Sequence, residues 1–170
     1  QEPVIFDPSL VATSKENIEK HLEYQGYYNS KVSDEIITKD KITTVRYNIT
    51  LGKQYPISDI SYNISDSTLA KTFYADSLQN MIKAGEYLSE EYLNNVSNDI
   101  SQYLRNKGYY GFSNNFFAYT ADTLHNRNKA SLNVDVKENH NVFHFGDVTM
   151  MPMRKPANPL VYEFVGDSVV

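Results

Sequence analysis

Histidines and glutamates are the residues of this 170-residue chain whose spacing comes closest to a chemical site. His140 and His144 stand four apart, which is a metal-ligand spacing on a helix, but the sequence around them leads into a strand. Glu90 and Glu91 are neighbours, and adjacent residues on a helix point to different faces, so they do not form a pair of catalytic acids. We therefore expect neither a metal site nor a catalytic residue.

Composition removes further classes of chemistry. The chain has no cysteine, which excludes disulfides, zinc-thiolate sites, iron-sulfur clusters and cysteine nucleophiles. Its 16 Lys and Arg against 21 Asp and Glu give a net charge of -5 without a basic block, so we do not expect a nucleic acid partner. No glycine-rich phosphate loop and no nucleotide fingerprint occurs in the sequence. The expectation is a protein that is not an enzyme and holds no cofactor.

The strongest signal is an internal repeat. The stretch "LEYQGYYNS" at Leu22–Ser30 returns as "LRNKGYYGF" at Leu104–Phe112, and aligning Gly26 with Gly108 gives an offset of 82 residues. In the second copy an apolar stripe at the helical period precedes the glycine, which predicts a helix with one buried face: Leu93, Val96, Ile100 and Leu104. The repeat therefore predicts two equivalent amphipathic helices.

Both helices carry start signals. Asp7 is placed as the N-cap of the first helix, with Pro8 at the first helical position, and Ser89 is placed as the N-cap of the second. Glu90 and Glu91 then fall in the first turn, where the helix dipole favours negative charge.

Both helices also carry the same stop signal. A helix that ends at Lys107 needs a left-handed residue next, and glycine takes that conformation without a Cβ penalty. The tyrosine that follows is then directed back at the leucine four residues before the glycine. We interpret both copies as a structural helix-end motif, made of Leu22, Gly26 and Tyr27 in the first copy and of Leu104, Gly108 and Tyr109 in the second.

Two strands are predicted after each helix. In the first unit Val32–Lys39 passes through Asp40-Lys41 into a second strand. There the apolar residues alternate with polar ones and predict one buried face, made of Val45, Tyr47, Ile49 and Leu51. In the second unit Asn115–Ala121 leads through a polar loop into a strand with Leu132, Val134 and Val136 on one face. Both units therefore have the same order of elements: a helix, the glycine-tyrosine turn that ends it, and a β-hairpin.

An opening strand repeats at another offset. "YPISDI" (Tyr55–Ile60) and "FHFGDV" (Phe143–Val148) match at 88 residues, and the apolar phase slips inside each copy, which predicts a bulge. We therefore expect three tandem units of the α+β class. Residues 1–52 hold the second helix and hairpin of a partial unit, residues 53–139 a complete β-α-α-β-β unit, and residues 140–170 the truncated start of a third.

The segment "GEYLSEEYLNNVSNDISQYLRNKGYYGF" resembles the POTRA region of the BamA/TamA (Omp85, D15 surface antigen) family of outer-membrane proteins, in the form seen in Bacteroidetes. The resemblance implies units with a three-stranded mixed sheet covered by two helices on one face. It also implies a location in the periplasm, N-terminal to the protein's own membrane β-barrel. The implied partners are accessory assembly subunits and unfolded outer-membrane protein segments.

Sheet edges are the candidate binding sites, since their backbone groups can pair with an incoming extended chain. The resemblance places the strand after the second helix at an edge. The candidate protein-binding residues are therefore Val32, Asp34, Ile36, Asn115, Phe116, Phe117 and Tyr119. We expect at least one of the three rings to be available beside its edge, and the alternative is that the rings pack on the helices or on a neighbouring unit.

Two other classes of function are also compatible with the sequence, a glycan-binding module and an enzyme. The 14 tyrosines could serve a periplasmic or surface glycan-binding module, which requires exposed rings on one flat face, and an enzyme on an unfamiliar fold requires a pocket with perturbed carboxylates. The repeat favours a scaffold of docking modules over both. We expect a monomer, in which strand exchange through Leu160–Phe164 could fill the place of the missing opening strand in a neighbouring molecule.

Overall fold

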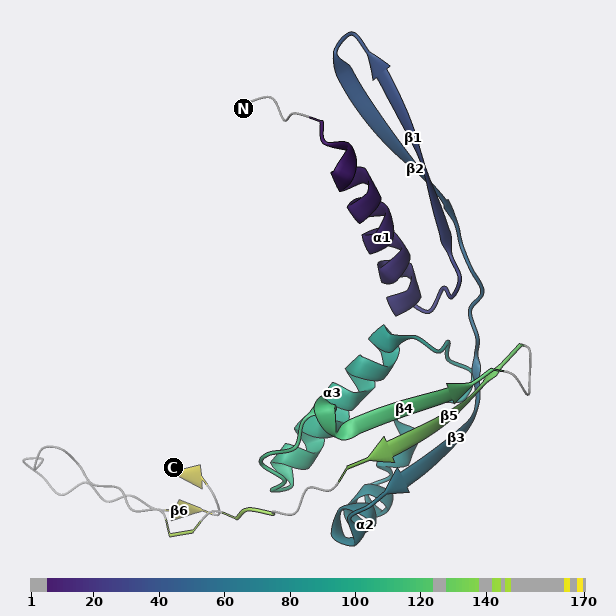
Figure 1. The fold of residues 1–170 in the computed structure, drawn as a ribbon. Coiled ribbons are helices and arrows are strands. Elements are labelled where there is room, and N and C mark those ends of the chain that lie inside the picture. The colour runs from purple at the N-terminus through teal and green to yellow at the C-terminus, as the bar shows by residue number, and fades with distance from the viewer. Residues whose placement is uncertain are drawn as a thin grey trace, which may run out of the picture.

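The computed structural model describes residues 6–123, 128–137, 142–144, 146–147, 164–165 and 168–169 (Figure 1). Within these ranges no helix is both long and apolar enough to cross a bilayer. The elements of the first part are α1 (Pro8–Tyr24), β1 (Lys31–Lys39) and β2 (Ile42–Thr50). Those that follow are β3 (Ile57–Ile64), α2 (Ser67–Ala75), η1 (Leu78–Asn80), α3 (Glu90–Asn106), η2 (Asn114–Phe116), β4 (Phe117–Asp122) and β5 (Ala130–Val136).

The second part of the chain is built on a mixed sheet of order β3-β5-β4. β5 lies in the middle, parallel to β3 and antiparallel to β4, so the α+β class and the three-stranded mixed sheet are confirmed. The register slips between Ile57 and Asp59, where the sequence predicts a bulge. Both β3 and β4 are edge strands, because each has a strand partner on one side alone among the described residues.

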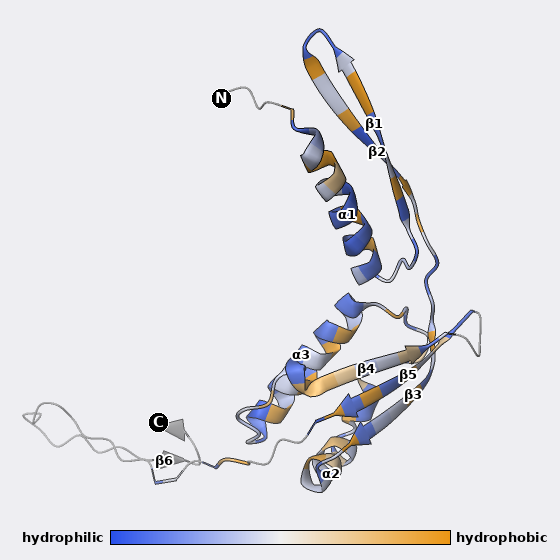
Figure 2. Cartoon of the chain, in the orientation of Figure 1, coloured by the Kyte–Doolittle hydropathy of each residue, from blue (hydrophilic) through white to orange (hydrophobic). Residues whose placement is uncertain are grey.

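One face of this sheet carries the core. Every second residue of β5 is buried, and these side chains share one cluster with Leu69 and Phe73 of α2 and with Ile100 and Leu104 of α3. The opposite face is polar, with Asn63 Nδ2 donating to Asp135 Oδ1 at 2.9 Å across the strands. Figure 2 shows the same division of the helices into an apolar stripe and a polar outer side. Both helices therefore cover one face of the sheet, as predicted.

The helix starts agree with the sequence. Asp7 accepts a hydrogen bond from the Ser9 amide at the start of α1, and Ser89 accepts one from the Tyr92 amide at the start of α3. The first of the two helices predicted for the complete unit is α2, a nine-residue helix that is followed by the single turn η1.

The helix ends are two copies of one corner. Gly26 and Gly108 have φ of 89° and 97°, in the left-handed region. The amides that follow donate back to the leucine carbonyls, from Tyr27 to Leu22 O at 2.8 Å and from Tyr109 to Leu104 O at 3.0 Å. These are Schellman bonds, and the helix-end motif is confirmed in both places.

The first part of the chain is a hairpin with one helix on it. β1 and β2 pair over nine residues each and turn through Asp40 and Lys41, which both have positive φ as a tight two-residue turn requires. Among its described residues, the buried apolar side chains are Val11, Leu22 and Val32. The prediction that Ile49 and Leu51 share a buried face is wrong, since they are 49% and 57% exposed. In the second part, α2 and α3 cover the equivalent face of β5, and β3 extends the sheet beside it.

One predicted strand boundary needs correction. The strand expected from Asn115 begins at Phe117, because residues 114–116 form the turn η2. Of the predicted exchange strand Leu160–Phe164, residues 160–163 lie outside the described residues. Phe164 belongs to β6 (Phe164–Val165), which pairs antiparallel with β7 (Ser168–Val169).

The corner at Gly108 generates a stability prediction. In Gly108→Ala the new side chain is strained at a φ of 97°, and its Cβ would lie 2.6 Å from Phe143 O. We expect the free energy of unfolding to fall by about 1–2 kcal/mol or more in urea titrations. Gly111→Ala is the matched control, since a Cβ there has no neighbour within 4 Å. Equal effects of the two substitutions would contradict the assigned role of Gly108.

The buried side of β3 generates a pH prediction. Burial raises the pKa of Tyr62, whose hydroxyl donates to Gln79 O at 3.0 Å. The unfolded chain ionises this tyrosine near 10.0, while the folded chain keeps it protonated. Above that pH the folded state binds more protons, so the free energy of unfolding falls as the pH rises. Urea titrations between about pH 8 and about pH 11 should show this loss, and Tyr62→Phe should reduce its slope. An unchanged slope in the variant would refute the assignment.

Candidate protein-binding edges

The β4 edge presents backbone groups in a defined pattern. The Lys137 amide donates to Phe116 O at 2.9 Å, one position before the first pair of the β4–β5 ladder, Phe117 with Val136. Hydrogen-bonded and non-bonded pairs alternate along an antiparallel ladder. The C=O of Phe117 and the N–H and C=O groups of Tyr119 and Ala121 therefore point away from β5, toward the open side, while the Phe117 amide donates to Asn114 O in η2.

The aromatic side chains near this edge belong to the core. Phe116 stacks on Phe112 with ring centroids 5.0 Å apart, and Phe117 meets the same ring edge-on at 5.6 Å. The ring of Tyr119 lies parallel to that of Phe117 at 6.1 Å, and its hydroxyl bonds to Ser97 Oγ. Burial raises the pKa of Tyr119, although the bond to Ser97 lowers it. The packing alternative therefore holds for these rings, with Phe117 buried and the others half-buried.

The exposed side chains of β4 are small or polar. Ala118, Thr120 and Ala121 are exposed, and so is Asn115 in the turn before the strand. An incoming strand can approach this margin without meeting a bulky side chain. Of the predicted residues, Phe117 and Tyr119 contribute main-chain groups. The sequence prediction missed Ala121, whose only signal is its alternation with Phe117 and Tyr119.

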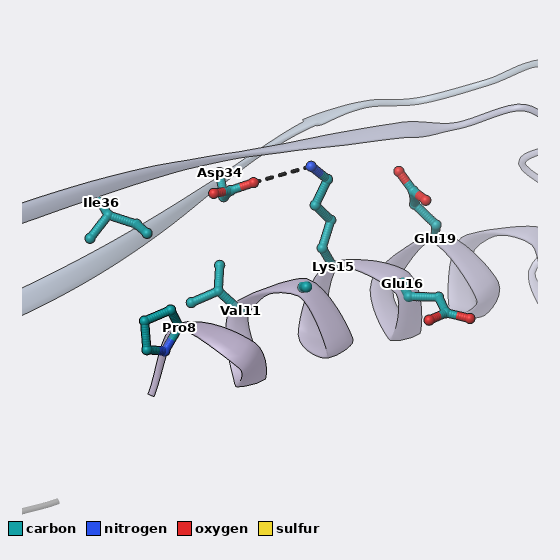
Figure 3. Close-up of a pocket in the computed structure, with 8 residues that line it drawn as sticks. Pro8, Val11, Lys15, Glu16, Glu19, Asp34 and Ile36 are labelled. Carbon is teal, nitrogen blue, oxygen red and sulfur yellow. Dashed lines mark hydrogen bonds and ion pairs between the residues drawn. The ribbon is translucent and has the colours of Figure 1, made fainter. Parts of the chain in front are cut away.

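The β1 edge is partly closed by α1. Glu19 Oε1 accepts a hydrogen bond from the Val32 amide at 2.9 Å, and Val32 is 4% exposed. Lys15 Nζ pairs with Asp34 Oδ1 at 3.1 Å. Figure 3 shows this ion pair between the helix and the strand. The Val32 amide is thus not free to receive a strand, although the sequence indicates Val32 as a candidate.

Beyond Asp34 the same edge opens. The Val32 amide points out of the ladder, so by alternation the main-chain groups of Asp34 and Ile36 point outward as well. Ile36 is 45% exposed and lines an open hollow of about 310 Å³ between β1 and α1. Figure 3 shows Ile36 on the strand above Pro8 and Val11 of the helix. Glu19 and Lys15 had no local signal in the sequence, because their contacts join residues 13 and 19 positions apart.

Two of the exposed tyrosines lie at opposite ends of α3. Tyr87 is 53% exposed and lies just before α3, while Tyr110 is 78% exposed and lies just after it. A helix of this length separates them by roughly 25 Å. The flat aromatic platform that a glycan-binding module requires is therefore not formed by these two rings.

Comparison with known proteins gives a family and a fold. Residues 56–139 match the POTRA family model, described as the surface antigen variable number repeat. A search of curated proteins gives no match. The chain is similar in structure to POTRA domains 3–5 of BamA from Haemophilus influenzae, at 13% identity and a TM-score of 0.50. BamA from Haemophilus ducreyi lacking POTRA domains 1–3 also matches, at 16% identity, a TM-score of 0.46, and 81% and 24% coverage of the two chains.

The Haemophilus influenzae match covers 79% of this chain and 52% of that one, so the chain spans about half the length of that structure. This coverage is more than residues 56–139 account for, and the likeness in fold therefore extends into the α1–β1–β2 part. The predicted resemblance to POTRA domains of the BamA/TamA family is confirmed, while the Bacteroidetes form stays a prediction. Residues 56–139, which hold the unit of β3, α2, α3, β4 and β5, are a POTRA domain of the kind described as the surface antigen variable number repeat.

Proposed function

We propose that the chain is the periplasmic POTRA region of an outer-membrane assembly or translocation factor of the BamA/TamA type. It binds unfolded outer-membrane protein segments, and accessory subunits, by adding them as a strand to the edge of β4. The observation that carries the proposal is the outward carbonyl of Phe117 and the outward amides and carbonyls of Tyr119 and Ala121, on an edge with small exposed side chains.

Main-chain pairing suits a receiver of many clients. Every residue except proline supplies one amide and one carbonyl, so an added strand is held without regard to its side chains. Segments of outer-membrane proteins alternate apolar and polar residues, and a strand with that pattern can place one side over the exposed Ala118 and Thr120. The polar face of the sheet continues this surface through Asn133 and Asp135.

The β4 edge is favoured over the β1 edge. α1 occupies the first half of β1 through Glu19 and Lys15, which leaves a shorter free margin from Ile36 onward. β4 has six residues in continuous register with β5, from Phe117 to Asp122, and rests on the larger core. A rigid template loses less entropy when it orders an incoming strand.

POTRA domains of BamA-like proteins are non-enzymatic scaffolds, and residues 56–139 match the POTRA family model. The side chains of the edges perform structural tasks: Glu19 holds an amide, Lys15 holds a carboxylate, and Tyr119 bonds to Ser97. We propose that the binding form is a monomer, since an added client strand would occupy the edge through which two copies could pair.

The Ala121→Pro variant tests the edge. Proline removes one outward amide of β4 and leaves the bonds between β4 and β5 in place. The probe is a synthetic peptide of about ten residues with alternating apolar and polar side chains. We expect its dissociation constant, measured by fluorescence anisotropy, to rise about tenfold.

Ala121→Val is the matched control, because it keeps the amide and favours a strand. It should bind the peptide as the parent chain does. The proposal fails if Ala121→Pro binds as tightly as Ala121→Val, or if peptide-induced chemical shift changes fall along β3 and not along β4.

A further inference from the structure

The rows of side chains across the outer face of the sheet define what lies beside a client strand on β4. Ala118 pairs with Asp135 of β5, and Asp135 pairs in turn with Asn63 of β3. Figure 1 shows β4 and β3 on opposite sides of β5. A strand added to β4 extends this row by one residue, since side chains in register share a face of the sheet. The client residue opposite Ala118 is therefore the next member of the row that contains Asp135.

The carboxylate of Asp135 is held by neutral donors. Asn63 Nδ2 donates to its Oδ1 at 2.9 Å, and Asn133 Nδ2 donates to its Oδ2 at 3.1 Å. None of the ion pairs among the described residues includes Asp135. A carboxylate has about four acceptor sites, so each oxygen can accept a further donor. The side chain is half-buried, and the lower local dielectric strengthens its attraction to a cation.

Ala118 leaves a passage between the open edge and this carboxylate. Its side chain is a single methyl group on the outer face, and the residue is exposed. Adjacent strands lie about 4.8 Å apart, so the backbone of an added strand lies about 10 Å from β5. Lysine and arginine can cross this distance, because their apolar stems can lie on the methyl group while the charged heads extend beyond it. Shorter polar side chains end above Ala118.

The charges of the outer face favour a cationic client. β3, β4 and β5 contain no lysine or arginine. Their outward side chains include three carboxylates, those of Asp59, Asp122 and Asp135. The face of the β1–β2 hairpin that points away from α1 is opposite in sign, with three cations and one carboxylate: Lys31, Lys39, Arg46 and Glu35. A cationic strand is therefore attracted to the side of β4 and repelled from the side of β1.

We propose that the β4 edge prefers client strands with lysine or arginine in the row of Ala118, because the cationic head crosses the alanine and pairs with Asp135. The inference rests on the proposed function and adds to main-chain pairing a side-chain contact that discriminates between clients. Asp135 is thus a specificity-determining residue of the edge. Client segments with an acidic residue in this row bind more weakly, since like charges on neighbouring strands repel each other.

Three peptides of about ten alternating residues test the preference. They share one apolar set, and their polar set is lysine, glutamine or glutamate. We expect the lysine peptide to bind the 170-residue chain about three to ten times more tightly than the glutamine peptide, measured by fluorescence anisotropy at about 0.15 M salt. The glutamate peptide should bind more weakly than the glutamine peptide.

Two variants locate the contact. Asp135→Asn removes the carboxylate, and Ala118→Leu keeps it but obstructs the passage. Each should bring the affinities for the lysine and glutamine peptides to within about twofold of each other. Asp59→Asn is the matched control, because it removes the same charge from β3, about 14 Å from the client strand, where the screening length is about 8 Å. It should leave the preference unchanged.

The outcomes separate this inference from the proposed function. If the parent chain binds the lysine and glutamine peptides equally and Ala121→Pro weakens both, strand addition stands and the role of Asp135 is overturned. The same role is overturned if Asp59→Asn lowers the preference as much as Asp135→Asn does, or if Ala118→Leu leaves it intact. If none of the three peptides binds, the proposed function fails and the inference fails with it.

Discussion

The left-handed glycine at the end of each long helix is the constraint on which the rest of the structure depends. At φ near 90° the chain reverses within two residues, so that Tyr109 returns to the helix and bonds to Leu104 O. That turn sends the chain through Phe112 and η2 into β4, and thereby sets where the edge strand begins. The absence of a Cβ also leaves room for a neighbouring backbone, from Leu88 at Gly26 and from Phe143 at Gly108. One residue type therefore ends the helix and brings the following segment into contact.

The unit that this turn connects has a sheet with one buried face and an unpaired edge strand, β4. The side chains of α2 and α3 cover alternate residues of β5, and the polar residues between them form the outer face. The sheet has three strands, so it keeps two edges, and β4 shows outward amides and carbonyls flanked by small side chains. Binding by such a margin needs no special side chain, which fits the lack of any catalytic constellation in the sequence.

Much of the fold was predictable from the sequence, because many of its features depend on interactions between neighbouring residues. The N-caps at Asp7 and Ser89, the stripe of α3, the stops at Gly26 and Gly108 and the turn at Asp40-Lys41 each depend on residues within one or two turns of each other. The candidate edge was predictable in position but not in detail. Contacts between Glu19 and Val32, or between Tyr119 and Ser97, join distant residues and leave no periodic signal. The rings of Phe116 and Phe117 follow the same rule, since the turn η2 lets both reach Phe112 where a continuous strand would separate them.

Amide hydrogen exchange along β4, with and without the alternating peptide, tests the central claim most directly. In the free chain the amides of Ala118 and Thr120, which face β5, should exchange slowly, and those of Tyr119 and Ala121 should exchange fast. Saturating peptide should slow the exchange at Tyr119 and Ala121 specifically. Bound peptide that leaves these two amides fast, or protects β3 in their place, would contradict the account.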